Sequence, residues 1–269
     1  MIVVGRNYAT DQIGGIHDDE AANAYGYRSG LVPGVALFTA ALPHVTELIG
    51  KSWAARGRVH LHFPRPCYEG GELMLKARPI ERDGSVRIDL VDAENSNSCA
   101  MSFFEDSGTP PRAEDYPVEP SQTWAESAED YLLDLENMRA ISRAATAVDI
   151  AQYVSDVGGQ DPFLVEDLVN PGYLLRTYVY ITRLNFPEKL SGPTIHVSSI
   201  ARYFNPIPVG TVVSIRGKVK HIFAKRGNRY VTYDYAWFTE DGTAVLHDEH
   251  TVVYELRAHR KSRGEHSGD

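Results

Sequence analysis

The sequence has few cysteines and no long apolar run, and both absences narrow the class of protein. Cys67 and Cys99 are the only cysteines in 269 residues, and they do not form a metal-type spacing. Two free thiols are typical of a reducing compartment, so we expect a cytoplasmic protein without a metal site. No stretch is long and apolar enough to span a membrane, and residues 1–10 lack the regions of a signal peptide. We therefore expect no membrane partner.

An excess of basic residues is also missing. Lys and Arg number 27 against 36 Asp and Glu, which gives a net charge of −9. A nucleic-acid surface needs clustered Lys and Arg, so we expect no nucleic-acid partner. The hydrophobic content of 43% is ordinary for a globular protein, and the length suggests two domains or one large one.

The most informative stretch begins at a histidine and ends in an apolar helix. His17 is followed by acidic residues, and a Val-Pro-Gly turn ending at Gly34 then opens an apolar run that stops at Gly50. A helix that is apolar on all sides must be buried on all sides. The first N–H groups of a helix point at whatever precedes it. The pattern predicts a buried helix whose start faces His17, and Pro43 is predicted to kink or divide that helix.

The order of predicted elements in the first half recurs in the second. Strands are predicted at 58–63, 72–82, 85–93, 98–105, 194–204, 211–223, 229–239 and 243–256, and further helices at 18–25, 146–157 and 173–185. The Pro-Gly helix starts are at Gly34 and Gly172. The turn glycines Gly70 and Gly210 are separated by almost the same number of residues as Gly34 and Gly172 are. These similar offsets indicate an internal duplication.

Each half therefore predicts one apolar helix and an antiparallel meander that can wrap around it. We expect an α+β protein with a double hot-dog fold, in which two antiparallel sheets each surround a central apolar helix. Residues 107–123 contain four prolines and predict a linker. The expected units are a first hot-dog domain with the site over 1–120, a second over 121–260, and a flexible tail over 261–269.

The chain resembles the MaoC-like, R-specific enoyl-CoA hydratase family in its double hot-dog form. The resemblance is tightest from Ile16 to Val35 and from Ile195 to Gly210. The family's hydratase motif is Asp-x-Asn-Pro-x-His, and the matching window here runs from Gln12 to His17. Only the histidine matches, and Gln12 stands at the position of the Asp. The corresponding window of the second half, 156–161, keeps the Asp and has another Asp in place of the His.

The resemblance implies addition of water to a 2-enoyl thioester, or the reverse, without a cofactor. The substrate would be an acyl-CoA or an acyl-carrier thioester. His17 is the predicted base, because the pKa of an imidazole lies near the operating pH. Asp11 is predicted to fix the tautomer of His17, and Gln12 can instead orient the water.

Substrate binding is predicted at the starts of the two central helices. The N–H groups of Gly34 and Val35 would bind the thioester oxygen, where negative charge develops. Asn170 and Gly172 form the equivalent helix start in the second half and are predicted to help hold the substrate. The resemblance also allows two such pseudo-dimeric chains to pair as a homodimer.

Two other functions fit the same sequence. A hot-dog thioesterase would use a carboxylate near a central helix, which Asp11, Asp156 or Asp161 could supply. A non-catalytic acyl-CoA-binding protein would keep the fold without the catalytic pair. Histidines in the predicted strands are interpreted as ordinary strand residues, namely His60, His62, His196, His247 and His250.

Overall fold

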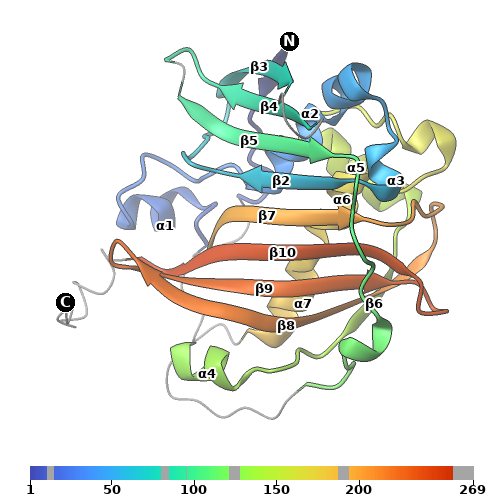
Figure 1. The fold of residues 1–269 in the computed structure, drawn as a ribbon. Helices are drawn as coiled ribbons and strands as arrows, with labels where there is room; N and C mark the ends of the chain where they lie inside the picture. Colours follow the sequence, from blue (N-terminus) through green and yellow to red (C-terminus); the bar gives the residue numbers. More distant parts are fainter. Residues whose placement is uncertain (11–14, 80–84, 95, 121–127, 187–193, 257–269) are drawn as a thin grey trace.

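The strands of the computed structural model form one continuous antiparallel sheet, and not the two separate sheets predicted from the sequence (Figure 1). The structure describes residues 1–10, 15–79, 85–94, 96–120, 128–186 and 194–256. The prediction of two sheets is wrong because the edge strands of the two halves hydrogen-bond to each other. The sheet consequently runs through the whole molecule.

Among the described residues, each half contributes five strands. The first half has β1 (Ile2–Val4), β2 (Arg58–His62), β3 (Glu72–Pro79), β4 (Val86–Val91) and β5 (Asn97–Phe104). The second half has β6 (Ile141–Ala144), β7 (Ile195–Tyr203), β8 (Val212–Lys225), β9 (Asn228–Phe238) and β10 (Ala244–Glu255). The order across the sheet is β1-β3-β4-β5-β2-β7-β10-β9-β8-β6. The second half repeats the order of the first in the opposite direction, with β2 and β7 at the junction.

The two halves are related by one constant offset in sequence at this junction. The Tyr203 N–H donates to the Gly57 carbonyl, and the Phe63 N–H donates to the Val197 carbonyl, both at 2.9 Å. The offset that carries Gly57 to Val197 also carries Phe63 to Tyr203, so each bond is the copy of the other. The pairing supports the predicted internal duplication, and the domain boundaries at 120 and 260 stay a prediction.

The helices agree with the sequence in position and differ in continuity. They are α1 (Asp19–Ala24), α2 (Gly34–Ile49), α3 (Trp53–Arg56), α4 (Ala128–Asp134), α5 (Ala147–Asp156), α6 (Pro171–Arg176) and α7 (Tyr178–Asn185). The α2 helix ends before Gly50, as predicted, and is not divided at Pro43. The single helical run predicted over 173–185 is two helices, because the chain breaks at Thr177.

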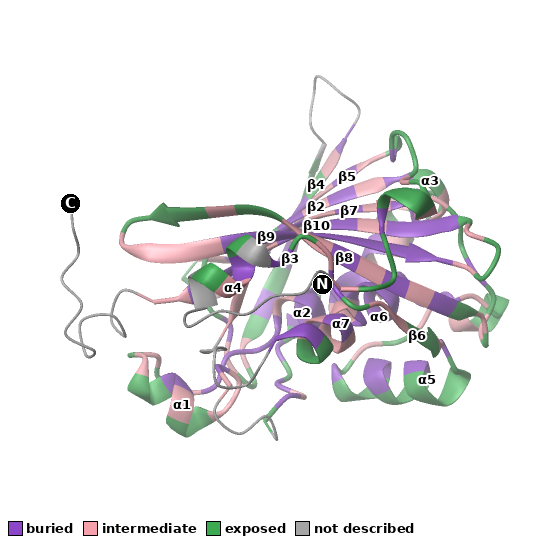
Figure 2. Ribbon diagram, turned by 90° about the horizontal axis from the view of Figure 1, so that it is seen from below, coloured by how far each residue is buried: buried purple, intermediate pink, exposed green. Residues whose placement is uncertain are grey.

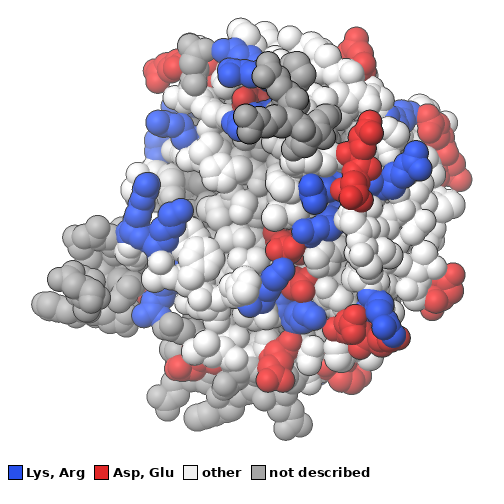
Figure 3. All heavy atoms as spheres, in the orientation of Figure 1, with Lys and Arg blue, Asp and Glu red and all other residues white. Residues whose placement is uncertain are grey.

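The central helices cover one face of the sheet and leave the other face to polar side chains. Figure 2 shows α2, α6 and α7 on the same side of the sheet. The opposite face carries both basic and acidic side chains (Figure 3). Glu249 on β10 forms ion pairs with Arg202 and Lys220. None of the described helices is long and apolar enough to cross a membrane.

The linker between the halves crosses this polar face (Figure 1). The Arg216 guanidinium donates to the carbonyls of Ala113 and Tyr116 on the linker. The Tyr116 hydroxyl donates to Asp234 on β9 at 2.8 Å. The linker therefore lies on the side of the sheet opposite to the central helices.

Candidate active site

A cavity of about 950 Å³ lies where the start of α2, α7, the start of β7 and the end of β10 meet. Its walls come from both halves of the chain, and they include His17, Gly34, Phe63, Tyr178, His196 and His250. The structure thus brings the predicted base and the start of the predicted buried helix to one cavity.

His17 lies in the wall of this cavity, in the loop before α1. Its Nδ1 is 2.6 Å from the Leu31 carbonyl oxygen, so Nδ1 carries the proton and donates it to that oxygen. Nε2 is then the basic nitrogen. Burial lowers the pKa of His17 below its ordinary value, and Arg183 lowers it further, while the bond to Leu31 raises it. Asp11 and Gln12 lie outside the described residues, and among the described residues no carboxylate bonds to His17.

Gly34 forms the start of α2 and faces the ring of Phe63. A Cβ atom at Gly34 would lie 2.9 Å from three atoms of this ring, so only a glycine fits without moving the ring. The first N–H groups of a helix have no acceptor within it, which leaves those of α2 directed toward the cavity end of the helix. The Val35 side chain is buried in the core, and Val35 does not contribute to the described cavity wall.

Asn170 and Gly172 lie outside the described wall of the cavity. The Asn170 side chain caps α6, because its oxygen accepts the N–H groups of Gly172 and Tyr173. A Cβ atom at Gly172 would lie 2.2 Å from the Oγ1 of Thr39 and 3.1 Å from its Cα. These contacts explain both residues by helix capping and by the close packing of α6 on α2. Their predicted contact with substrate stays a prediction.

The carboxylates considered for thioester hydrolysis serve local structure. The Asp161 carboxylate accepts the N–H groups of Phe163 and Leu164. The Asp156 carboxylate accepts from Gln152 on the preceding turn of α5. Neither aspartate belongs to the described cavity wall. The remaining candidate, Asp11, is outside the described residues.

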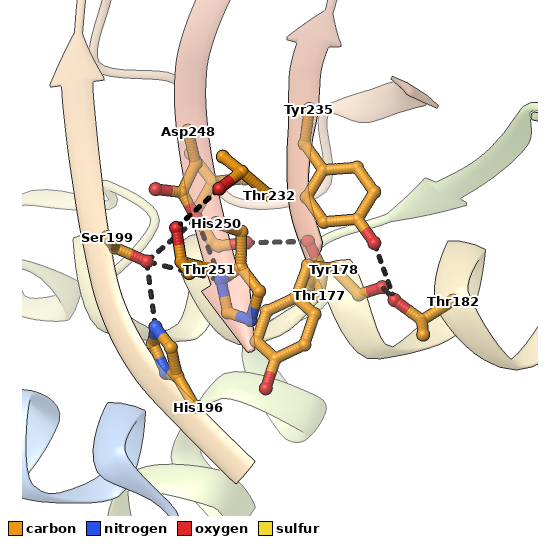
Figure 4. A network of polar contacts seen from close by, with 11 residues as sticks. Thr177, Tyr178, Thr182, His196, Ser199, Thr232, Tyr235, Asp248, His250 and Thr251 are labelled. Carbon is orange, nitrogen blue, oxygen red and sulfur yellow. Dashed lines mark hydrogen bonds and ion pairs between the residues drawn. The ribbon is translucent and has the colours of Figure 1, made fainter. Parts of the chain in front are cut away.

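A buried polar network adjoins the cavity in the second half, and the sequence analysis did not identify it. Figure 4 shows Ser199 on β7 facing Asp248 and His250 on β10, with His196 below. The Ser199 hydroxyl donates to the Asp248 carboxylate at 3.0 Å. The Nδ1 of His250 lies 3.1 Å from the same carboxylate oxygen, and the Nε2 of His196 lies 2.9 Å from the Ser199 oxygen. Ser199, Asp248 and His250 are almost fully buried.

One set of protons satisfies all these contacts. Ser199 has a single hydroxyl proton, which it gives to Asp248, so its oxygen accepts the Nε2–H of His196. Asp248 has acceptor oxygens only, so His250 must donate through its Nδ1–H. The Nε2 of His250 is then unprotonated, and it is a buried atom without a hydrogen-bond partner among the described residues.

The surroundings of His250 keep its imidazole neutral. Its ring contacts those of Tyr178, at 4.0 Å between centroids, and His196, at 3.9 Å, and these two rings also contact each other. Burial lowers the pKa of His250 to about 3, and it also lowers the pKa of His196 well below its ordinary value. Burial raises the pKa of the Asp248 carboxyl to about 6. The cavity wall thus contains a neutral imidazole with a carboxylate behind it.

Strand alternation is the signal that could have separated these histidines. Successive side chains of a strand point to opposite faces. His247 therefore lies on the polar face, where its Nε2 contacts Asp234 at 2.6 Å. Asp248 and His250 lie on the face of the apolar residues Leu246 and Val252, which are both buried. Two ionisable residues on the apolar face of a strand are unusual and mark a candidate site.

Two equivalent halves joined into one sheet, with central helices on one face, define a double hot-dog fold. Comparison with solved structures agrees. A provisionally assigned MaoC domain protein dehydratase from Chloroflexus aurantiacus superposes with a TM-score of 0.61 at 14% identity, over 96% of this chain and 95% of its own. A conserved hypothetical protein from Mycobacterium tuberculosis, described as a double hot-dog, gives 0.58 at 10% identity, over 94% and 93%.

A thioesterase shares the fold as well. A provisionally assigned oleoyl thioesterase from Lactobacillus plantarum superposes with a TM-score of 0.55 at 11% identity, over 95% of this chain and 96% of its own. Scans against protein-family models and against curated proteins gave no match. The structural neighbours are therefore MaoC-like dehydratases and a thioesterase, and at these identities they show the fold alone.

Proposed function

We propose that the chain is an acyl-thioester hydratase or dehydratase of MaoC-like type, which adds water to a 2-enoyl thioester or removes it from a 3-hydroxyacyl thioester. The observation that supports this proposal is the shared cavity of His17 and the α2 start at Gly34. The reaction requires a proton acceptor for water next to N–H donors for the thioester oxygen. These two groups come together in a cavity large enough for an acyl group and part of its carrier.

Each residue has a defined role in the hydration direction. The Nε2 of His17 takes a proton from water as the oxygen bonds to Cβ. The N–H group of Gly34 stabilises the negative charge that develops on the thioester oxygen, with the dipole of α2 behind it. Val35 does not line the described cavity, so we propose no contact of its N–H with the substrate. Asp11 or Gln12 is proposed to orient His17 or the water. The substrate is an acyl-CoA or an acyl-carrier thioester.

The test is incubation with crotonyl-CoA and with longer 2-enoyl-CoAs, following the loss of the conjugated absorbance. His17→Ala is expected to lower kcat/KM for hydration by ~10²–10⁴, the usual contribution of a general base. His62→Ala is the matched control, because His62 is an exposed histidine on β2 outside the described cavity wall. Hydration by His17→Ala at the rate of the wild-type protein would contradict the role of His17.

Thioester hydrolysis is the second candidate, and its support is the Asp248 carboxylate beside the cavity together with the fold shared with a thioesterase. The same incubation distinguishes the functions when free thiol is followed in parallel. Release of one free thiol for each thioester consumed, without formation of a 3-hydroxyacyl thioester, would favour the thioesterase. Binding of the acyl-CoA with neither reaction would favour a non-catalytic acyl-CoA-binding protein.

A further inference from the structure

We infer that His250, oriented by Asp248, is a second acid–base residue of the cavity and acts at Cα of the substrate. The inference rests on the proposed function and adds to it a catalytic residue from the second half of the chain. Three observations carry it: the unused lone pair of His250, its place in the wall of the cavity that the start of α2 also lines, and the residues at the equivalent positions of the first half.

His250 lines the cavity and has a basic nitrogen that makes no hydrogen bond among the described residues. Its Nδ1–H is held by Asp248, and its Nε2 has no partner among the described residues although the side chain is fully buried. A buried nitrogen without a partner loses the hydrogen bonds that water would give it. A substrate atom in the cavity can restore such a bond. The geometry is that of an imidazole whose tautomer a carboxylate fixes for proton transfer.

A continuous row of side chains connects His250 to the start of α2. The Gly34 position touches the ring of Phe63, whose centroid lies 4.7 Å from that of His196. The His196 ring stacks on the His250 ring at 3.9 Å. Gly34 and His250 consequently line the same cavity, with Phe63 and His196 between them.

The duplication shows that the fold does not need a histidine at this position. The offset that relates the two halves carries Val59 on β2 to Ser199 on β7. Ser199 pairs with His250 across β7 and β10, and Val59 pairs with Phe103 across β2 and β5. Phe103 is therefore the equivalent of His250.

The same relation makes Met101 the equivalent of Asp248. Ala201 pairs with Asp248, and its counterpart Leu61 pairs with Met101. The first half thus fills with apolar side chains the three positions where the second half buries a serine, an aspartate and a histidine. Because apolar residues are sufficient to build this part of the fold, the polar set requires another explanation, which catalysis provides.

The step is balanced most simply in the dehydration direction. The neutral Nε2 of His250 takes the proton from Cα, and the C–O bond at Cβ breaks as the C=C bond forms. The departing hydroxide takes a proton from the Nε2 of protonated His17 and leaves as water. His17 has lost one proton to the leaving hydroxide, and His250 has gained one from Cα. Proton exchange with water restores both residues. Hydration is the reverse, with His17 as the base for water.

Asp248 and Ser199 are positioning residues in this scheme. Asp248 holds the Nδ1–H of His250 and faces the positive charge that His250 gains. Ser199 lies on the Nδ1 side of His250 together with Asp248. A serine nucleophile would need to lie at Nε2, with the carboxylate at Nδ1. Ser199 does lie at the Nε2 of His196, but the Nδ1 of His196 has no carboxylate partner among the described residues and Ser199 is buried, so the geometry does not support Ser199 as a nucleophile.

The decisive experiment compares two histidine variants of the same strand on the full chain. His250→Asn keeps an amide N–H near the Nδ1 position for Asp248 and removes the Nε2 lone pair. His247→Asn is the control, because His247 also contacts an aspartate but on the opposite face of the sheet. With crotonyl-CoA, we expect His250→Asn to lower kcat/KM by ~10²–10⁴. We expect His247→Asn to stay within about threefold of the wild-type protein, because His247 lies on the opposite face of the sheet, outside the described cavity wall.

Asp248→Asn tests the positioning role. We expect kcat to fall with little change in KM, because Asp248 does not touch the substrate. Nitrogen NMR of the imidazole is expected to show the Nδ1–H tautomer of His250 in the wild-type protein and a mixture of tautomers in Asp248→Asn. An unchanged kcat together with an unchanged tautomer would contradict the positioning role.

The outcomes separate this inference from the proposed function. If the wild-type protein hydrates crotonyl-CoA and His250→Asn does so equally fast, the inference is wrong and the function stands. If the wild-type protein hydrates no enoyl-CoA, the function is wrong. The site is then judged by NMR with butyryl-CoA. A change in the His250 Nε2 resonance supports a ligand-facing nitrogen, and an unchanged resonance overturns it.

Discussion

Gly34 and Gly172 occupy equivalent helix starts in the two halves and meet different neighbours. The neighbour of Gly34 is the ring of Phe63, which borders a cavity into which it can turn. The neighbour of Gly172 is Thr39, including its backbone Cα at 3.1 Å. The same methyl group therefore has different consequences at the two positions.

We predict that Gly172→Ala is the more destabilising of the two. The added methyl must separate α6 from α2, and overpacking of this kind costs about 1–3 kcal/mol. Gly34→Ala is expected to cost less stability and to lower hydration activity, because it pushes Phe63 into the cavity. Urea unfolding and the crotonyl-CoA assay measure the two effects. Equal losses of stability would contradict the different roles of the two glycines.

The two-histidine scheme predicts an activity that falls as the pH rises. The reactive complex carries one proton between His17 and His250, in both directions of the reaction. The pKa of His17 is lowered from its ordinary value of 6.5 and that of His250 lies at about 3. Because the pKa of His17 lies below 6.5, we expect kcat/KM to be highest at acidic pH. It should fall as the pH rises above the pKa of His17, by about tenfold per pH unit. A rate that rises with pH would instead indicate His17 acting alone as the base.

The sequence predicted one part of the candidate site and missed the other for a physical reason. His17 and Gly34 are close in sequence and joined by a recognisable helix start, so local pattern was sufficient to place them together. Asp248 and His250 form a site only through their contacts with Ser199 and His196 on the neighbouring strand β7. These two residues come much earlier in the sequence. Such long-range pairing is not visible in local periodicity.

At the scale of elements, the predictions were accurate where local signals were strong. The α2 helix begins at Gly34 and ends before Gly50, and α5, which Thr146 caps, lies within the predicted range 146–157. The break between α6 and α7 was missed, because Thr177 is an acceptable helix residue by composition. The Thr177 hydroxyl accepts a hydrogen bond from the indole N–H of Trp237 at 2.8 Å. This tertiary contact cannot be predicted from the local sequence.

The duplication supplies a test of whether the polar network is needed for folding. We predict that replacing Ser199, Asp248 and His250 with the Val, Met and Phe of the first half keeps the protein folded. Apolar replacement of a buried charged set is often neutral or stabilising by about 1–4 kcal/mol, and overpacking can offset part of this gain.

The triple variant should lose hydration activity while it unfolds in urea at or near the wild-type midpoint. A matched variant, Ser199→Val alone, leaves Asp248 and His250 buried without the serine and is expected to unfold more easily. Loss of folding in the triple variant would show that the network is structural.

At the scale of the whole molecule, the number of sheets could not be read from the sequence. The strands β2 and β7 are each the last strand of their half-sheet, and nothing in their own residues requires them to pair with each other. Five residue pairs join the two strands, from Arg58 with Arg202 to His62 with Ser198. The pairing removes two exposed edges, which would otherwise be open to association.

Buried neutral histidines predict a protein that weakens in acid. The pKa values of His17, His196 and His250 are lowered in the folded state, so the unfolded chain binds their protons first as the pH falls through 6.5. The raised pKa of Asp248 acts in the opposite sense below about pH 6. Three groups outweigh one, and we expect a loss of about 2–4 kcal/mol in the free energy of unfolding between pH 7 and pH 5.

Urea unfolding at the two pH values measures this loss. His250→Asn removes one of the three histidines and is expected to make the loss smaller, whereas His221→Asn, at an exposed histidine of β8, is expected to leave it almost unchanged. A free energy of unfolding that stayed constant or rose on acidification would contradict the burial of neutral imidazoles.

The continuous chain between the halves has a consequence for how such a site can arise. In a dimer of two separate identical subunits, every substitution occurs twice, so a histidine gained on one side appears on the other as well. When the two halves belong to one chain, this constraint is absent, because a substitution in one half leaves the other half unchanged. This chain has Phe103 on one side and His250 on the other. We therefore expect one acyl ligand per chain, where a symmetric pair of subunits would bind two.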